Sequence, residues 1–443
     1  MSIPLSEALK FWAKLGLISF GGPAGQIAVL HQELVEKRRW ISERRFFHAL
    51  NYCMILPGPE AQQLVTYIGW LMHRSMGGVL AGSLFILPSF FSFIGLAWIY
   101  ITFGQIPWIA AIFFGIKPAI TAIVLHAGMR IGKRTLYNPI LKSIALGSFL
   151  AIFLLNLPFP VIVLIAACVG VWGNQYHPEH FSPPSNSSGS HPDAPGEAFF
   201  DDHSPRPEHT QFSQKKMVTQ GVLLLSCWLI PLGSLIAIFG WETLYPELAW
   251  FFTKAAFLTF GGAYAVLPYV YQGAVDHFHW LSTIQMMDGL ALGETTPGPL
   301  IMIVTFVGFL AGYTQHLIAN NHPFWFGVLG ATIATWFTFL PSFLFILVGG
   351  PLIESSHGKP ALAAPLTAIS AAVVGVIVNL GLFFAYHVFV PRGFSGQISW
   401  SAIFICLMAS LALFKYQKGV ISVLLASGMA GLLWHLASGL API

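Results

Sequence analysis

Long apolar stretches dominate the chain, and they predict helices that cross a membrane. A transmembrane helix needs about 20 apolar residues. Nine continuous apolar runs approach this length: 77–103, 106–129, 140–157, 159–173, 217–239, 325–348, 361–389, 398–414 and 419–439. Four further runs carry glycine and proline at their centres: 11–30, 47–72, 250–267 and 285–312. The pattern therefore predicts an all-α polytopic membrane protein in which some helices are broken.

Composition supports this prediction and excludes several other classes of protein. Of the 443 residues, 56% are hydrophobic and only 9% are charged, and the mean hydropathy is +0.71. Soluble domains carry about 25% charged residues. Disorder, a coiled coil, a disulfide-rich secreted domain and most soluble enzymes are therefore excluded. The four cysteines lie in apolar segments without C-x-x-C spacing, which favours buried, unreactive side chains.

A polar stretch interrupts the apolar pattern near the middle of the chain. Residues 174–216 are rich in Ser, Pro and His, which predicts a disordered linker. Its five histidines have a spacing that fits no defined metal site, so we expect them to be solvated. The stretch divides the chain into an N-terminal repeat (1–173) and a C-terminal repeat (240–443), with 217–239 as a connecting transmembrane helix.

An internal repeat is the strongest signal in the sequence. Several short motifs recur at a constant offset of 240 residues: Phe11-Trp12-Ala13-Lys14 with Phe251-Phe252-Thr253-Lys254, Phe20-Gly21-Gly22 with Phe260-Gly261-Gly262, Trp40 with Trp280, and Pro57-Gly58-Pro59 with Pro297-Gly298-Pro299. Pro88-Ser89-Phe90 recurs as Pro341-Ser342-Phe343 at an offset of 253. Constant offsets of this kind predict two homologous helical repeats.

The placement of basic residues predicts that the two repeats have opposite orientations in the membrane. Lys and Arg favour the cytoplasmic side. Residues 37–45 contain five basic side chains, whereas the matching residues 277–285 contain no Lys or Arg. The extra helix at 217–239 supplies the inversion. The remaining basic residues share one side with 37–45 if the runs 11–30 and 47–72 are re-entrant; full spans are the alternative.

The broken runs predict a binding site for an anion. Non-helical backbone inside a membrane is tolerated only where it is buried or lines a cavity, and paired broken helices in inverted repeats are typical of secondary transporters. Each restart exposes the free N–H groups and partial positive charge of a helix N-terminus, which binds anions. Four such ends are expected, near Gly22, Pro59, Gly262 and Pro299, and together they suit a compact oxyanion. Close helix packing is the alternative explanation for the glycines.

Ionisable and hydrogen-bonding side chains near the breaks extend this predicted site. Lys14 and Lys254 occupy the same repeat position; they neutralise an anionic substrate or extend to the nearest interface. Glu60 and Glu294 are proton carriers or, for Glu60, a helix cap, and Asp288 is a weaker candidate of the same kind. The predicted substrate-binding residues are Lys14, Gly21, Gly22, Pro23, Gln26, Gly58, Pro59, Gln62, Lys254, Gly261, Gly262, Tyr264, Thr295, Thr296, Gly298 and Pro299, with Gln63 as a further candidate. Lys117 lines the pathway or forms a structural ion pair, and His31, His48 and His126 are more simply explained by packing.

Motifs of other protein classes are missing from the sequence. It contains no G-x-x-x-x-G-K-[ST], H-E-x-x-H, G-x-S-x-G or G-x-G-x-x-G. We therefore expect no enzyme activity, no cofactor, no metal centre and no nucleic-acid partner. A membrane enzyme or scaffold acting on lipid is a third hypothesis, but breaks at the midplane argue against it, because catalysis on headgroups requires residues at the interface.

The quoted motifs resemble those of the chromate transporter family. The resemblance rests on Phe20-Gly21-Gly22-Pro23-Ala24-Gly25-Gln26, Arg39-Trp40-Ile41, Leu56-Pro57-Gly58-Pro59 with Gln62, and their second copies around 260–264 and 296–299. It implies a bacterial inner-membrane protein of two fused homologous domains that exports chromate by using an ion gradient and so gives chromate resistance. Chromate is similar in shape to sulfate, so sulfate or another small anion is the alternative substrate. The sequence leaves the oligomeric state open, including a homodimer.

Overall fold

Helices make up nearly all of the protein. The structure, a computed structural model, describes residues 3–20, 22–176, 178–181, 200, 208–210, 213–260, 262–315, 322–355, 363–391 and 398–438. Within these ranges the one strand-like pairing is an isolated bridge between Ile41 and Phe200. The predicted all-α fold class is confirmed.

Two runs of helices follow one another in the same order. The first half contains α1 (Leu5–Ile18), α2 (Gly22–His31), η1 (Gln32–Lys37), α3 (Glu43–Ile55), α4 (Glu60–Phe103), α5 (Pro107–Thr135), α6 (Pro139–Leu155), α7 (Phe159–Tyr176) and α8 (Pro178–Phe181). After η2 (Glu208–Thr210) and α9 (Gln214–Phe239), the second half contains α10 (Leu244–Leu258), α11 (Ala263–Tyr271), η3 (Gln272–His277), α12 (Thr283–Thr295), η4 (Leu300–Met302), α13 (Ile303–Gln315), α14 (Pro323–Ser355), α15 (Ala363–Phe389), α16 (Trp400–Phe414) and α17 (Val420–Ser438).

Each of the nine continuous apolar runs corresponds to a helix. Seven helices within the described ranges are long and apolar enough to cross a membrane: α4, α5, α7, α9, α14, α15 and α17. Three further apolar segments are shorter, namely α6, α16 and Leu300–Gln315. The protein is therefore a multi-pass membrane protein.

All four interrupted runs are broken helices, as predicted. α1 ends at Ile18 before α2 begins at Gly22, and the other three breaks separate α3 from α4, α10 from α11, and α12 from η4. The helices that flank the breaks are short, because α1, α3, α10 and α12 have 14, 13, 15 and 13 residues. At 1.5 Å per residue they are shorter than a hydrocarbon core of about 30 Å. α4 also contains a kink at His73 and Arg74, where φ is −135° and 58°.

Backbone conformation repeats along with the order of the helices. Gly22 and Gly262 have φ of 68° and 98°, and Gly58 and Gly298 have φ of 129° and 95°. Side chains are strained in this left-handed region, so glycine is required at all four breaks. The π-helical turns η1 and η3 also begin 240 residues apart, at Gln32 and Gln272.

The same aromatic contact occurs in both halves and joins the connection after the π-helical turn to the first helix of its half. Trp40 packs edge-to-face on Phe11 at 4.9 Å, and Trp280 packs in the same way on Phe251 at 5.4 Å. This contact explains why both residues of each pair recur in the sequence repeat. Arg38 lies over Phe11 and Trp40 in the first half, whereas its counterpart Phe278 stacks on Trp280.

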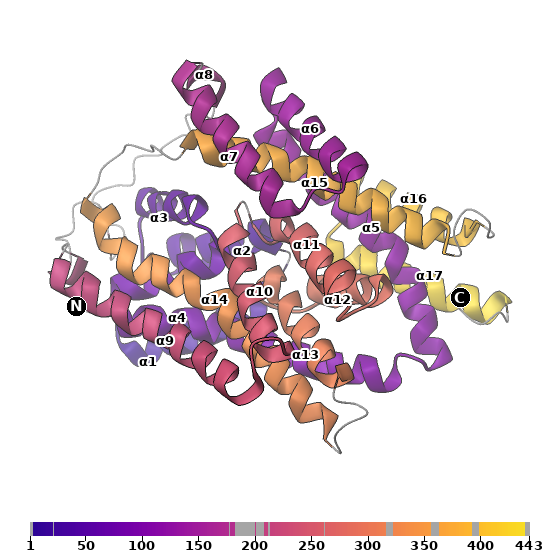
Figure 1. Ribbon diagram of the computed structural model, residues 1–443, viewed down its shortest axis with the longest axis horizontal. Helices are drawn as coiled ribbons and strands as arrows, with labels where there is room; N and C mark the ends of the chain where they lie inside the picture. Colours follow the sequence, from indigo (N-terminus) through magenta and orange to yellow (C-terminus); the bar gives the residue numbers. More distant parts are fainter. Residues whose placement is uncertain are drawn as a thin grey trace.

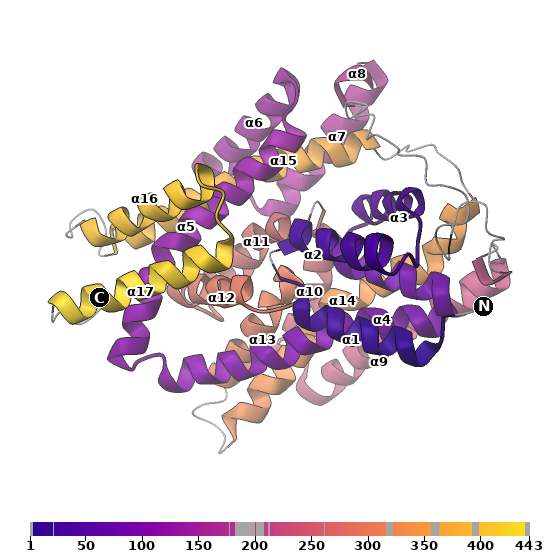
Figure 2. The same cartoon turned by 180° about the vertical axis from the view of Figure 1, so that it is seen from behind.

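The two halves interlock around the broken helices. α1 packs on α4 and α10 packs on α14 in the same way. α5 lies against α16 and α17 of the other half, and its counterpart α15 lies against α6 and α7. Figure 1 shows the two termini at opposite ends of the molecule, and both views place the short helices α2, α10, α11 and α12 among the longer ones (Figures 1 and 2).

Only parts of the polar stretch 174–216 are among the described residues, so its predicted disorder stays a prediction. Most of it lies outside the described residues, but Phe200 exchanges backbone hydrogen bonds with Trp40 and Ser42. Phe181 is buried against α7 and α15, and the side chain of Asn138 donates to the carbonyl of His180. The described pieces are therefore docked on the helices.

Replacing Gly298 with alanine tests the requirement for glycine at a break. A Cβ there adopts a strained φ and lies 2.7 Å from the Cβ of Ser89. We expect Gly298→Ala to lower the stability of the protein by about 2–5 kcal/mol, measured as thermal unfolding in detergent. Gly95→Ala is the control, because nothing lies within 4 Å of its Cβ and its backbone is helical. Equal stability of the two variants would contradict this account.

Candidate functional site

A reciprocal pair of backbone hydrogen bonds joins the breaks of the two halves. The N–H of Gly58 donates to the carbonyl of Thr259 at 2.7 Å, and the N–H of Gly298 donates to the carbonyl of Ser19, also at 2.7 Å. Each residue of the first bond lies 240 residues from its counterpart in the second. The P-G-P break of each half is thus held by the first break of the other half.

Side chains strengthen the same junction. The amide of Gln26, on α2, donates to the carbonyl of Gly298. The amide of Gln63 donates to the carbonyl of Pro57 at 2.7 Å and contacts the hydroxyl of Ser342 at 3.4 Å. Polar groups from α2, α4 and α14 therefore gather at the breaks.

The serines of the repeated Pro-Ser-Phe motif complete this exchange between halves. Ser342 on α14 lies against Gly58, and Ser89 on α4 lies against Gly298. Sequence analysis had found the motif without assigning it a role. The motif lies beyond the kink of α4 in the first half and on α14 in the second, and the tertiary fold brings each serine to the break of the opposite half.

The helix N-termini at the breaks are buried and lack side-chain caps. Pro59, Gly262 and Pro299 stand at the N-cap positions of α4, α11 and η4, and none has a side-chain cap. The first turns that follow are buried, at Glu60, Ala263 and Leu300. A buried helix end normally finds partners for its free N–H groups. These ends therefore have the properties of an anion site.

Several buried polar atoms at the breaks also lack a partner. Among the described residues, the hydroxyls of Ser19 and Ser89 and the carbonyl oxygens of Gln62 and Gln63 are buried without a hydrogen bond. The amide of Gln62 donates to Thr66 at 2.9 Å, within its own helix. Unpaired buried polar atoms are costly, so their concentration here indicates a polar ligand or water.

Both candidate proton carriers are buried beside the breaks. Glu60 is the first residue of α4 and is 9% exposed, and Glu294 lies near the end of α12 and is 5% exposed. The hydroxyl of Tyr264, in the first turn of α11, donates to the carboxylate of Glu294. Glu294 therefore connects two breaks of the second half, whereas no side-chain hydrogen bond caps the helix that Glu60 begins.

Positive charge reaches these carboxylates from one helix, which sequence analysis did not foresee. Arg134 on α5 acts electrostatically on Glu60, and Arg130, one turn earlier, acts on Glu294 and Tyr264. Arg130 is half-buried and Arg134 is exposed. In the sequence, both arginines belong to the basic residues that indicate the cytoplasmic side. Their spacing of four residues, which places them on one helix face, was the available signal.

α12 carries another buried carboxylate, Asp288, nearer to its N-terminus than Glu294. The hydroxyl of Tyr100 donates to Asp288 at 2.8 Å, and Lys117 on α5 is the cation that acts on it. One oxygen of Asp288 has no partner. Among the described residues no ion pair joins Lys117 to Asp288, so both roles considered for Lys117 stay predictions.

The structure does not bring Lys14 and Lys254 to the breaks. Each lies on the exposed face of its helix, because α1 and α10 bury the opposite faces through Trp12 and Phe252. Lys254 instead lies over the ring of Trp250 at 6.0 Å.

The other predicted residues are placed as follows. Gly22, Gln26, Gly58, Gln62, Gly262, Tyr264 and Gly298 are buried at the breaks. Gly21 and Gly261 lie outside the described residues, as does the side chain of Pro23. The hydroxyls of Thr295 and Thr296 donate to carbonyls of their own helix, Leu292 and Gly293.

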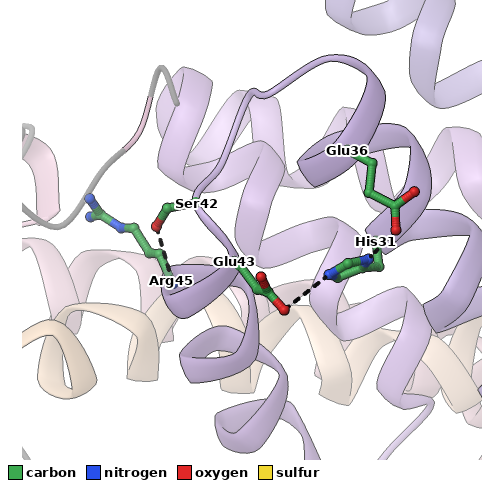
Figure 3. A network of polar contacts seen from close by, with 5 residues as sticks. All are labelled: His31, Glu36, Ser42, Glu43 and Arg45. Carbon is green, nitrogen blue, oxygen red and sulfur yellow. Dashed lines mark hydrogen bonds and ion pairs between the residues drawn. The ribbon is translucent and has the colours of Figure 1, made fainter. Parts of the chain in front are cut away.

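Polar contacts hold the connection between α2 and α3 outside the breaks (Figure 3). Nδ1 of His31 contacts Glu36 at 3.2 Å, and its Nε2 lies 4.0 Å from Glu43. Ser42 caps α3 by accepting from the N–H of Arg45. In the same connection, Lys37 hydrogen-bonds Glu33 at 2.7 Å and lowers the pKa of Glu33. His31 has a structural role, as expected.

Comparison with known proteins gives a consistent family assignment. The model of the family described as "Chromate transporter" matches residues 6–171 and 246–432. The chain belongs to the chromate transporter family. A chromate transport protein of Pseudomonas aeruginosa is 31% identical over 444 residues, which covers 97% of this chain and 92% of that protein.

More distant relatives also align along most of the chain. A chromate transport protein of Cupriavidus metallidurans is 27% identical, with 84% of this chain and 80% of that protein covered. An uncharacterized transporter of Methanocaldococcus jannaschii is 24% identical, with 93% and 90% covered. No solved structure matches the chain. The relatives in this chromate transporter family are named as transporters, which agrees with the expected absence of enzyme motifs.

Replacing Gln26 with methionine tests the side-chain link between the halves. Methionine keeps the volume but leaves the buried carbonyl of Gly298 without this donor. We expect the variant to lose about 1–3 kcal/mol of stability, seen as a lower thermal midpoint. Gln214→Met, at an exposed position at the start of α9, is the control and should be neutral. An unchanged midpoint for Gln26→Met would show that the link contributes nothing.

Proposed function

We propose that this protein is a secondary transporter that exports chromate across the bacterial cytoplasmic membrane, is driven by an ion gradient, and gives chromate resistance. The observation that carries the proposal is the set of buried, uncapped helix N-termini at breaks that the two halves hold together. Chromate is a tetrahedral dianion, and converging N–H groups with partial positive charge suit such a ligand. The printed names of the relatives favour chromate over other oxyanions.

Substrate binding falls to the backbone at the breaks and to neutral side chains. The N–H groups after Gly22, Pro59, Gly262 and Pro299 face the anion. The hydroxyl of Ser89, which has no partner among the described residues, can donate to it, as can the amide N–H of Gln62 that is not bonded to Thr66. Arg130 and Arg134 on α5 attract the anion toward the carboxylates. Lys14 and Lys254 are left out of this proposed site because they are exposed.

Coupling to protons is assigned to Glu60 and Glu294. An anion site binds its substrate poorly while a neighbouring carboxylate is ionised, because the two negative charges repel each other. Protonation removes this repulsion, so proton and anion bind together and cross in the same direction. With one proton per dianion the net charge moved is negative, and the inside-negative membrane potential drives it outward. Glu294 is held by Tyr264 on the next break, so its charge acts directly on the helix N-terminus that would contact the anion.

Alternating access would follow from the relation between the repeats. We propose that residues 1–173 and 240–443 are inverted repeats that flank the connecting helix, and that the broken helices are re-entrant. The repeated backbone at the breaks, the short flanking helices and the reciprocal hydrogen bonds support this proposal. Because the candidate site is buried, substrate enters only after one half moves relative to the other.

Uptake of labelled chromate into inside-out vesicles tests the function. We expect uptake that depends on the protein and on the electrochemical gradient across the vesicle membrane, and that excess sulfate suppresses, because the two anions have the same shape and charge. Vesicles without the protein are the control. Sulfate is the second candidate substrate, since the groups at the breaks recognise only the shape and charge of a tetrahedral oxyanion. No uptake of chromate, together with uptake of labelled sulfate, would move the assignment to that anion.

Replacing the two carboxylates separates coupling from binding. We expect Glu60→Gln and Glu294→Gln to abolish the response of transport to a pH gradient while they keep exchange of chromate across the membrane without a gradient. Asp288→Asn is the comparison, because Asp288 is buried on the same helix as Glu294 but bonds to Tyr100. A response to the pH gradient that survives in both glutamine variants would remove these residues from the coupling mechanism.

Labelling of matched cysteines tests the inverted topology. Positions 40 and 280 are buried at 7% and 4% exposure, so we choose the exposed Arg44 and Ile284, which also lie 240 residues apart. In a variant without native cysteines, Arg44→Cys should react from the cytoplasmic side and Ile284→Cys from the opposite side. Labelling of both from one side would contradict inversion.

A further inference from the structure

A polar cavity lies at the kink of α4, away from the breaks. It has a volume of about 270 Å³, and its lining includes Trp70, Arg74, Ser75, His209, Lys216 and Gln220. The segment of α4 from Glu60 to the kink separates it from the breaks by about 20 Å, at 1.5 Å per residue. The cavity is therefore distinct from the proposed transport site.

The end of the polar stretch 174–216 forms one wall of this cavity. At the kink the backbone of His73 and Arg74 leaves helical geometry. His209 reaches across and contacts the carbonyl of Trp70 through Nε2 at 2.9 Å, and its ring packs edge-to-face on Trp70 at 5.5 Å. Gln220, on α9, donates to Ser75 at 2.6 Å. The stretch that follows the first repeat is thus attached to the kink.

The described lining of the cavity carries positive charge from two basic side chains. Arg74 and Lys216 line it, and none of its described lining residues is acidic. Lys215 and Lys216 lie in the first turn of α9, and this turn contains no acidic residue. Ser213, the residue before the helix, forms no side-chain cap. Cations at a helix N-terminus repel its partial positive charge. Among the described residues, the ion pairs found involve neither Arg74 nor Lys216.

Histidine contributes a neutral group to this wall. Burial lowers the pKa of His209, and Arg74 and Lys216 lower it further, although the bond to Trp70 opposes this change. These effects favour the uncharged ring, whose Nε2–H donates to the carbonyl of Trp70. The two long basic side chains remain available to a ligand, and the cavity has room for an ion of a few heavy atoms with water.

We infer that this cavity binds a tetrahedral oxyanion of the phosphate or sulfate class, held between Arg74 of α4 and Lys216 at the N-terminus of α9. The bound anion neutralises both side chains and the helix end, and it fastens the end of the 174–216 stretch to the kink. Two sources have this chemistry: a free anion in the cytoplasm, or the phosphate of an anionic lipid at the membrane surface.

Thermal stabilisation of the purified full chain by added anion tests the inference, because a ligand of the folded state raises the midpoint of unfolding. Inorganic phosphate is one probe, and phosphatidylglycerol, compared with phosphatidylcholine, is the other. We expect a rise in midpoint for the intact protein. The double variant Arg74→Gln/Lys216→Gln should bind about tenfold or more weakly, because each charge-assisted bond contributes at least that factor.

Three controls make the outcome decisive. Lys215→Gln removes the same charge from the neighbouring residue, which does not line the cavity, and should keep the rise. Lys216→Gln alone replaces the double variant if the change at Arg74 prevents folding. Gln62→Ala, at the breaks, should also keep the rise. If this variant lost the rise in midpoint, the stabilising anion would be bound at the transport site instead.

The possible results separate the two sources and the error. A rise with phosphate that needs Arg74 and Lys216 indicates a free anion, and a rise only with phosphatidylglycerol indicates a lipid headgroup. No rise with either probe would overturn the inference. Loss of the rise in Lys215→Gln as large as in the double variant would overturn it too, because general surface charge would then explain the effect.

Discussion

The structure depends on how buried backbone groups are satisfied where helices break inside a membrane. The hydrocarbon of a membrane offers no hydrogen-bond partners, so an N–H or C=O at a break that does not meet a polar ligand or water needs a partner in the protein. The chain solves this by exchange: Gly58 donates to Thr259, and Gly298 donates to Ser19. Neither half supplies these partners for itself. The interlocked helices, and the gathering of all four breaks in one region, follow from this requirement.

This backbone arrangement is symmetric, but the side chains placed on it are not. Glu60 has Leu300 as its counterpart, Glu294 has Met54, and Gln26 has Val266. The backbone of both halves supplies the same helix ends, whereas charge and donors are distributed unequally between them. Such a division allows one half to carry groups that titrate or fasten while the other keeps the same shape. The proposed coupling through two unrelated carboxylates agrees with this specialisation.

The first segment of α4 links the two sites proposed for anions. Glu60 and Gln62 stand at one end of this segment, beside the breaks, and the kink with Arg74 ends it on the other side. His209 and the start of α9 fasten the kinked end. A ligand at the kink would therefore restrain the helix that carries groups of the transport site, since a helix transmits displacement along its axis as a rigid element.

Much of this organisation is readable in the sequence because it is local. Glycine at positive φ and proline at the start of a helix mark the breaks wherever they occur, and apolar runs of sufficient length mark the helices. The constant offset of 240 residues reveals the repeat, and each helix breaks at the glycine and proline residues that predict the break.

Tertiary structure decided the rest, because packing determines which side chains meet. Lys14 and Lys254 matched the repeat but lie on exposed faces, whereas Ser89, Ser342, Arg130 and Arg134 come to the site from distant helices. Likewise, Phe200 and His209, in the stretch 174–216, bond to the backbone of Trp40, Ser42 and Trp70, and no local pattern in the sequence indicates these contacts. Local chemistry fixes where a chain breaks, and long-range packing selects the partner that satisfies each break.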